Sequence, residues 1–132
     1  MSQVGESFFT VVGCMDGGVQ DVMAKYGQEK FGTKYPDTIT EAGIVGLLTT
    51  NPSERFLNNF KFKLLVSLDK HHSRGIVVDG HQECAGHPVE DAQHKTDIKK
   101  TVDLIAELIE NRVPVVGVFV VRDGEQWRTE EI

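Results

Sequence analysis

Three apolar runs rich in β-branched residues constrain the fold of this chain more than any other feature. They occupy residues 8–13 (FFTVVG), 76–80 (IVVDG) and 115–121 (VVGVFVV). Continuous runs of this kind are typical of parallel strands, whose side chains are covered on both faces of the sheet. Parallel strands need long connections, which are usually helices. The runs therefore predict an α/β fold with a mostly parallel sheet.

Helical patterns fill the long intervals between these runs. The clearest covers residues 91–111, where isoleucine and valine recur at helical spacing on one face and charged residues fill the other. A second helix is expected over residues 53–71, because Ser53 is a good N-cap. A third is expected over residues 19–31, and Gly32 would end it.

Two less regular segments are expected to complete the sheet. Pro36 and two glycines interrupt the region after the first helix, so only a short strand at residues 37–39 and a turn of helix at residues 44–48 are expected there. Near the C-terminus, the Asp-Gly pair at residues 123–124 is a turn signal. It predicts a hairpin in which residues 126–129 extend the edge of the sheet.

These elements combine into one domain over residues 1–132, with three layers (α-β-α) and a central, mostly parallel sheet of four strands plus a C-terminal edge strand. The net charge of -6, with 14 scattered basic residues, argues against a nucleic-acid or anionic-membrane partner. No apolar stretch approaches the roughly 18 residues of a membrane span. The N-terminus lacks the pattern of a signal peptide, so a cytoplasmic location is expected.

Two short segments that follow strands carry a candidate zinc site. Cys14 and Asp16 come after the first run, and His81 and Cys84 come after the second. Carboxyl ends of parallel strands lie at one edge of the sheet, so these side chains converge if the two strands are neighbours. Zn²⁺ commonly takes Cys sulfur and His nitrogen, and the fourth position would hold water or be closed by Asp16. Alternatively, both cysteines are small buried core residues.

In these segments the chain resembles the β-class carbonic anhydrases. Their zinc sites use a Cys-X-Asp-X-Arg segment after the first strand and a His-X-X-Cys segment after a later one, and here these read CMDGG from Cys14 and HQEC from His81. The resemblance implies a zinc ion on Cys14, His81 and Cys84. It implies a lyase that hydrates carbon dioxide reversibly to bicarbonate by a zinc-bound hydroxide, which Asp16 orients. It also implies a homodimer or higher homo-oligomer, because that family completes its active-site cleft across a subunit interface.

Gly18 is the main departure from the family pattern, which has Arg at this place. In the family the Arg keeps the Asp carboxylate turned away from zinc, so Asp16 is freer here to turn onto the metal. Three kinds of function stay open. The first is a zinc enzyme acting on carbon dioxide, carbonyl sulfide or carbon disulfide, and the second is a non-catalytic zinc-binding protein whose site Asp16 closes. The third is a metal-free enzyme with Cys14 as nucleophile, but no basic residue follows Cys14 until Lys25 to hold an anion.

Two histidines outside the ligand set also bear on function. His87 lies three residues beyond Cys84 and is a candidate for the proton relay, because the ordinary pKa of histidine is about 6.5. The alternative is a solvated loop residue. His94 is expected on the polar face of its helix and is assigned no role.

Overall fold

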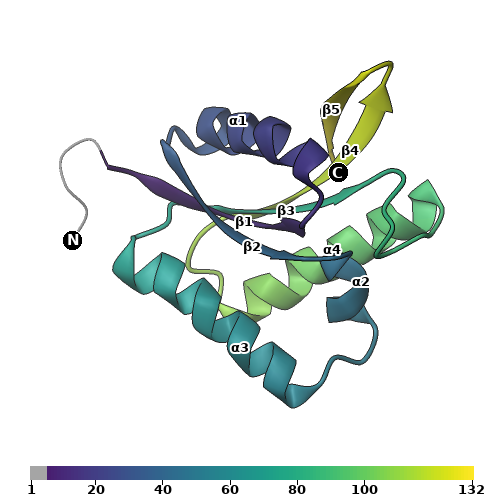
Figure 1. Cartoon of the computed structure of the whole chain (residues 1–132). Coiled ribbons are helices and arrows are strands. Elements are labelled where there is room, and N and C mark those ends of the chain that lie inside the picture. The colour runs from purple at the N-terminus through teal and green to yellow at the C-terminus, as the bar shows by residue number, and fades with distance from the viewer. Residues whose placement is uncertain (1–5) are drawn as a thin grey trace.

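The computed structural model describes residues 6–132 and confirms the predicted α/β architecture (Figure 1). Five strands form one sheet in the order β2-β1-β3-β4-β5. Their bounds are β1 Phe8–Cys14, β2 Tyr35–Glu41, β3 Ile76–His81, β4 Val115–Asp123 and β5 Gln126–Glu131. The first four strands are parallel, and β5 pairs antiparallel with β4 as the predicted hairpin. Residues 1–5, which belong to the N-terminal segment considered for a signal peptide, lie outside the described part of the chain.

Helices cover both faces of the sheet and give the three layers (Figure 1). They are η1 Gly17–Val19, α1 Gln20–Phe31, α2 Ile44–Thr49, α3 Glu54–Leu65, η2 Val66–Lys70 and α4 Asp91–Leu108. Helix α1 lies on one face, and α2, α3 and α4 lie on the other. The helices in the connections between parallel strands therefore pack on a face of the sheet.

Each face of the sheet has its own hydrophobic core. Val12, Val78 and Phe119 belong to the cluster beneath α2, α3 and α4, whereas Val11 and Val77 belong to the cluster beneath α1. Neighbouring residues alternate between the clusters because successive side chains of a strand point to opposite faces. All six residues of β3 are buried, as predicted for a central parallel strand.

Most elements differ from the prediction by a few residues at their ends, such as α4, which ends at Leu108. Strand β2 is longer than the expected strand at residues 37–39, because it is an edge strand and an edge tolerates Pro36. The helix expected over residues 53–71 changes at its end into the π-helical turn η2. This turn brings Ser67 to donate a hydrogen bond to Asp37 Oδ2 at 2.7 Å, so the polar end of the helix is tied to the edge strand.

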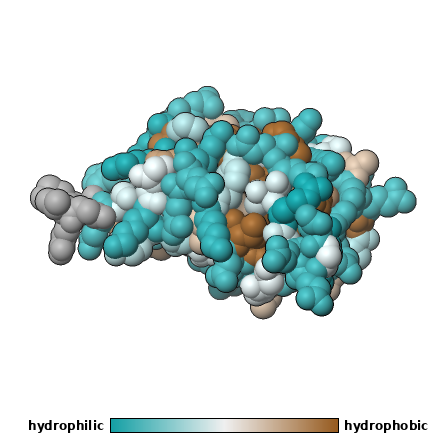
Figure 2. All heavy atoms as spheres, turned by 90° about the horizontal axis from the view of Figure 1, so that it is seen from above, coloured by the Kyte–Doolittle hydropathy of each residue, from teal (hydrophilic) through white to brown (hydrophobic). Residues whose placement is uncertain are grey.

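The outer surface over α1 and the hairpin is mostly hydrophilic. Figure 2 looks down on this face, and hydrophobic residues appear there as separate patches among hydrophilic ones. Among residues 6–132, no helix combines the length and the apolar character that a bilayer span requires.

His94 is buried, and its expected place on the polar face of α4 is wrong. Its side chain is 2% exposed, and its ring lies against Phe119 and edge-on to His87, with centroid distances of 5.5 and 4.9 Å. Gly80 on β3 leaves the room for this ring, because a Cβ at Gly80 would come within 2.5 Å of it. Position 94 lies one turn before Ile98 on the buried face of α4, so its helical spacing and not its polar side chain indicates where it lies.

We expect His94 to make the fold sensitive to acid. Burial first, then the charges of His87 and His81, lowers the pKa of His94 from 6.5 to about 4, although Asp97 and Asp91 oppose the shift. The unfolded chain takes up this proton near pH 6.5 and the folded chain only near pH 4, so the free energy of unfolding falls as the pH drops through this range. The loss is at most about 3 kcal/mol. Urea titrations of the parent and of His94→Gln measure it, and equal pH slopes for the two proteins would contradict the prediction.

Candidate metal centre

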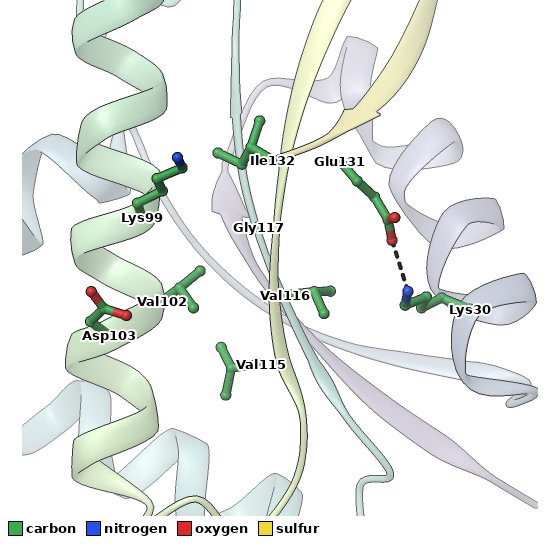
Figure 3. Close-up of a pocket in the computed structure, with 9 residues that line it drawn as sticks. All are labelled: Lys30, Lys99, Val102, Asp103, Val115, Val116, Gly117, Glu131 and Ile132. Carbon is green, nitrogen blue, oxygen red and sulfur yellow. Dashed lines mark ion pairs between the residues drawn. The ribbon is translucent and has the colours of Figure 1, made fainter.

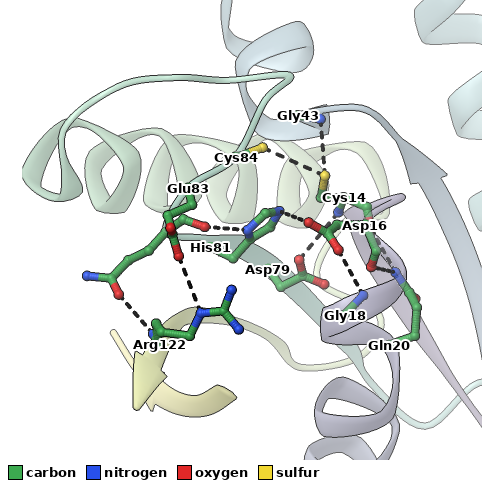
Figure 4. A network of polar contacts seen from close by, with 11 residues as sticks. Cys14, Asp16, Gly18, Gln20, Gly43, Asp79, His81, Glu83, Cys84 and Arg122 are labelled. Carbon is green, nitrogen blue, oxygen red and sulfur yellow. Dashed lines mark hydrogen bonds and ion pairs between the residues drawn. The ribbon is translucent and has the colours of Figure 1, made fainter. Parts of the chain in front are cut away.

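The carboxyl ends of β1 and β3 bring the two segments of the candidate metal site together (Figure 4). These strands pair directly, Cys14 ends β1, His81 ends β3 and Cys84 lies in the loop that follows. One ligand atom from each of the three side chains lies within 4.8 Å of the other two, and the two Sγ atoms are 3.7 Å apart. Within residues 6–132, this is the one group of three or more His, Cys and acidic side chains with such geometry.

The donor atoms of this cluster fit a zinc ion. Cys14, Cys84 and His81 are 6%, 4% and 1% exposed. The His81 Nδ1–H donates to the carbonyl oxygen of Gln82 at 2.7 Å, which is a usual support for a metal-binding histidine. His81 Nε2 is buried and has no hydrogen-bond partner in the described chain. A buried nitrogen without a partner is costly, and a metal bond would satisfy it.

The thiol of Cys14 ionises readily. Burial on its own would raise its pKa, but His81 and the backbone N–H groups of Gly43 and Asp16 lower the pKa to about 6. The Gly43 N–H donates to Cys14 Sγ at 3.5 Å. Burial, together with the nearby charge of Cys14, raises the pKa of Cys84. These contacts favour the thiolate form of Cys14, and thiolate is the form that binds metal.

Asp79 supports Cys14 from within the sheet. It is 2% exposed, and its Oδ1 accepts a hydrogen bond from the Cys14 N–H at 3.3 Å. Burial raises the pKa of Asp79 to about 7. Gly13 provides the space, because a Cβ there would lie 1.9 Å from Asp79 Oδ2. The backbone of Cys14 is thus fixed from the core side.

Asp16 stands beside the cluster. Its Oδ1 accepts a hydrogen bond from the Gly18 N–H at 2.8 Å, which caps η1, and its Oδ2 lies 3.8 Å from His81 Nε2. The Asp16 side chain is 42% exposed. Gln20 fixes the loop, since its Nε2 donates to the carbonyl oxygens of Cys14 at 2.9 Å and of Asp16 at 2.7 Å. The backbone of this turn therefore holds the Asp16 carboxylate, since position 18 has no Arg that could do so.

The β4–β5 hairpin adds two side chains that the sequence did not indicate. The Trp127 ring lies edge-on to His81 at a centroid distance of 5.7 Å, and Arg122 stacks on the indole with Cζ 4.3 Å from its centroid. Arg122 Nε also lies 3.4 Å from Glu83 Oε2, which links the hairpin to the loop between His81 and Cys84 (Figure 4). The Asp-Gly turn predicted the hairpin, but local sequence carries no signal for what its side chains contact.

His87 is packed inward, so it is not a solvated loop residue. Its side chain is 14% exposed, and its Nε2 lies 2.7 Å from Asp97 Oδ2. Gly46 leaves space for the ring, because a Cβ there would be 2.3 Å from His87 Nδ1. A proton relay through His87 stays a prediction.

A separate surface pocket of about 320 Å³ lies at the other end of β4 (Figure 3). Its lining residues are Lys30, Lys99, Val102, Asp103, Val115, Val116, Gly117, Glu131 and Ile132. Lys30 and Glu131 form an ion pair at 2.9 Å across it. The lining contains no Cys or His, so this pocket lacks the soft donors of the cluster at β1 and β3.

Known structures share this fold. The chain is similar to the beta-carbonic anhydrase isoform I of Trichomonas vaginalis, with 20% identity, a TM-score of 0.56 and coverage of 92% of this chain and 80% of that one. It is similar to the beta-carbonic anhydrase CafD of Aspergillus fumigatus, with 14% identity, a TM-score of 0.64 and coverage of 98% and 91%. It is also similar to a tetrameric beta-carbonic anhydrase of Sordaria macrospora, with 11% identity, a TM-score of 0.63 and coverage of 98% and 82%.

At these identities the structural likeness concerns the fold. No curated protein matches the chain. A family model does match it, over residues 4–132, and this family is described as "Putative carbonic anhydrase". Because the match extends over nearly the whole sequence, the chain belongs to this carbonic-anhydrase-like family.

Proposed function

We propose that the protein is a zinc-dependent lyase that hydrates carbon dioxide reversibly to bicarbonate. The observation that carries the proposal is the buried cluster of Cys14, His81 and Cys84, in which His81 Nε2 lacks a partner and Asp16 stands alongside. Three protein ligands with an open fourth position are the usual arrangement of a catalytic zinc site. Family membership supports the choice of substrate.

Three side chains would hold the ion through Cys14 Sγ, His81 Nε2 and Cys84 Sγ. Zn²⁺, when bound, supplies Lewis-acid activation of water near neutral pH. The two thiolates offset the charge of the ion, so we expect this activation to be weaker than it is with three neutral imidazoles. The carbonyl of Gln82 fixes the tautomer of His81 by holding the proton on Nδ1.

Asp16 is the residue that we assign to the reaction. Its Oδ1 is engaged by the Gly18 N–H, so its Oδ2 remains beside the cluster, 3.8 Å from His81 Nε2. There Oδ2 accepts a hydrogen bond from the attacking water and orients a lone pair of that water toward the carbon of carbon dioxide. No Asp16 oxygen belongs to the group of mutually close ligand atoms, which among residues 6–132 comes from Cys14, His81 and Cys84. This geometry supports an open fourth position over one closed by Asp16.

We also infer a homo-oligomer, a dimer or larger, in a reducing compartment such as the cytoplasm. The Sordaria macrospora enzymes that share the fold are tetrameric. Phe62 and Leu47 are 65% and 43% exposed, and association would cover apolar surface of this kind. Both cysteines are free thiols, which a reducing compartment preserves.

Zinc content measured together with stopped-flow hydration of carbon dioxide tests the proposal. We expect about one zinc per chain and measurable hydration in the parent, because three ligands and Asp16 are in place. Cys84→Ser removes one thiolate and should lose both properties while circular dichroism stays that of the parent. Light scattering on the same sample gives the subunit number, and assays with carbonyl sulfide and carbon disulfide compare the related substrates.

Two outcomes would overturn the proposal. One is a parent protein that takes up no zinc when zinc is supplied. The other is stoichiometric zinc without hydration, with X-ray absorption showing an oxygen ligand that disappears in Asp16→Ala. That second result would identify a closed, non-catalytic site.

A further inference from the structure

Trp127 occupies the space beside residue 18. A Cβ added to Gly18 would lie 3.0 Å from Trp127 Nε1 and 3.2 Å from Asp16 Oδ1, both tighter than ordinary contacts. The indole and the carboxylate therefore flank the same point of the turn. A Cβ added to the neighbouring Gly17 would meet nothing within 4 Å. The tight space is specific to residue 18.

The indole is held in this place from several elements. Its ring packs against the apolar cluster beneath α1 and lies edge-on to His81. Arg122, directly opposite Trp127 in the hairpin register, stacks on the ring and is itself paired with Glu83. The hairpin, strand β3 and the loop after β3 together fix the position of Trp127.

We propose that Trp127 is a positioning residue for Asp16. The indole packs beside the turn and keeps the Gly18 N–H on Asp16 Oδ1, which leaves Oδ2 beside the cluster. Positions 18 and 127 are consequently coupled, because a side chain at residue 18 would require Trp127 or Asp16 to shift. This inference rests on the proposed function, because it concerns the carboxylate assigned to the reaction.

A double-mutant cycle on Gly18→Ala and Trp127→Ala tests the coupling. Gly18→Ala places a methyl group against the indole and the carboxylate, so we expect kcat for carbon dioxide hydration to fall about tenfold with zinc content unchanged. Trp127→Ala loosens the turn and should cost a similar factor. The double variant should be no worse than Trp127→Ala, because the methyl group then has room. Losses that simply multiply would overturn the proposal, and Gly17→Ala is the matched control that should keep the activity of the parent.

A second readout does not depend on activity. Trp127 is the only tryptophan of the chain, so all tryptophan emission reports its surroundings. We expect Gly18→Ala to shift the emission maximum and to increase quenching by acrylamide, while Gly17→Ala leaves both unchanged. Cobalt(II) added to metal-free protein should quench this emission, because the indole lies next to His81.

The two readouts separate the two proposals. If the parent binds no zinc and hydrates no carbon dioxide, the proposed function has failed. The tryptophan emission then tests the coupling of positions 18 and 127 without an activity assay. Identical emission and acrylamide quenching in Gly18→Ala and Gly17→Ala would overturn the coupling. Trp127→Phe keeps an aromatic ring at this place and should retain most of kcat, whereas a loss as large as that of Trp127→Ala would contradict a role in packing.

Discussion

Gly43→Ala should lower the free energy of unfolding by about 3 kcal/mol or more and weaken zinc binding by about one to two orders of magnitude. Gly43 has φ +60°, and a Cβ there would lie 2.4 Å from the carbonyl carbon of Gly86. Backbone atoms cannot step aside as a flexible side chain can. The methyl group must therefore push the loop after Cys84 away from the loop after β2.

This displacement would disturb both thiols at once. The Gly43 N–H is the donor to Cys14 Sγ, and Gly86 lies two residues after Cys84 in the loop that carries the second sulfur. A shift between these loops removes a hydrogen bond that stabilises the Cys14 thiolate and moves Cys84 relative to it. Urea titration measures the stability, and competition with a chromogenic chelator measures the zinc affinity.

Gly32→Ala is the matched control. Gly32 has φ +61°, caps α1 and would have nothing within 4 Å of an added Cβ. It therefore carries the same backbone strain without the clash, and we expect a loss of about 1 kcal/mol with zinc affinity unchanged. If Gly43→Ala loses no more stability or zinc than Gly32→Ala, the contact with Gly86 does not support the site.

The sequence predicted the sheet and the meeting of the ligand segments because both depend on local pattern. Apolar runs marked β1, β3 and β4, and helical periodicity marked the connections between them. Once β1 and β3 are parallel neighbours, the residues that follow them must emerge at one edge. The positions of Cys14, His81 and Cys84 follow from this rule and from the order of the strands.

The sequence did not predict features that depend on contacts between distant segments. The close approach of Gly43 to Gly86, the burial of His94 against Gly80 and the position of Trp127 each join residues from different elements. Glycine was informative only after the fold was known, because a missing Cβ has a meaning only when its neighbours are placed. His94 was assigned to the polar face because its side chain is polar, although it lies four residues before Ile98 and therefore on the buried face of α4.

The loop after β1 holds Asp16 without the Arg of the family motif. Without Arg at position 18, Asp16 was expected to be freer to turn onto the metal. In the structure the Gly18 N–H donates to Asp16 Oδ1, and Gln20 ties the backbone of the same loop. The contact between Gly18 and Asp16 is local in the sequence, because Asp16 is the N-cap of η1. The Gly18 N–H points at the Asp16 carboxylate because η1 begins at this place. Coordination of a metal by Oδ2 stays a prediction.

Asp16→Asn should keep the zinc of the parent and lose about a hundredfold or more in kcat/KM for carbon dioxide hydration. The Gly18 N–H needs an acceptor, so the amide oxygen of Asn should take the place of Oδ1 and its NH₂ group the place of Oδ2. A donor then faces the attacking water where an acceptor stood, and the water loses the group that orients it. Stopped-flow hydration and zinc analysis of the same samples measure the two effects.

The control must remove one negative charge nearby without touching the turn. Asp21→Asn does so, because Asp21 is an exposed residue in the first turn of α1, and it should keep both zinc and activity. Unchanged hydration in Asp16→Asn would remove Asp16 from the reaction. Loss of zinc in Asp16→Asn would instead make Asp16 a ligand through Oδ2, with the fourth position closed. Only an Asp16→Asn variant that keeps zinc and loses hydration activity would show that Asp16 takes part in the reaction without binding the metal.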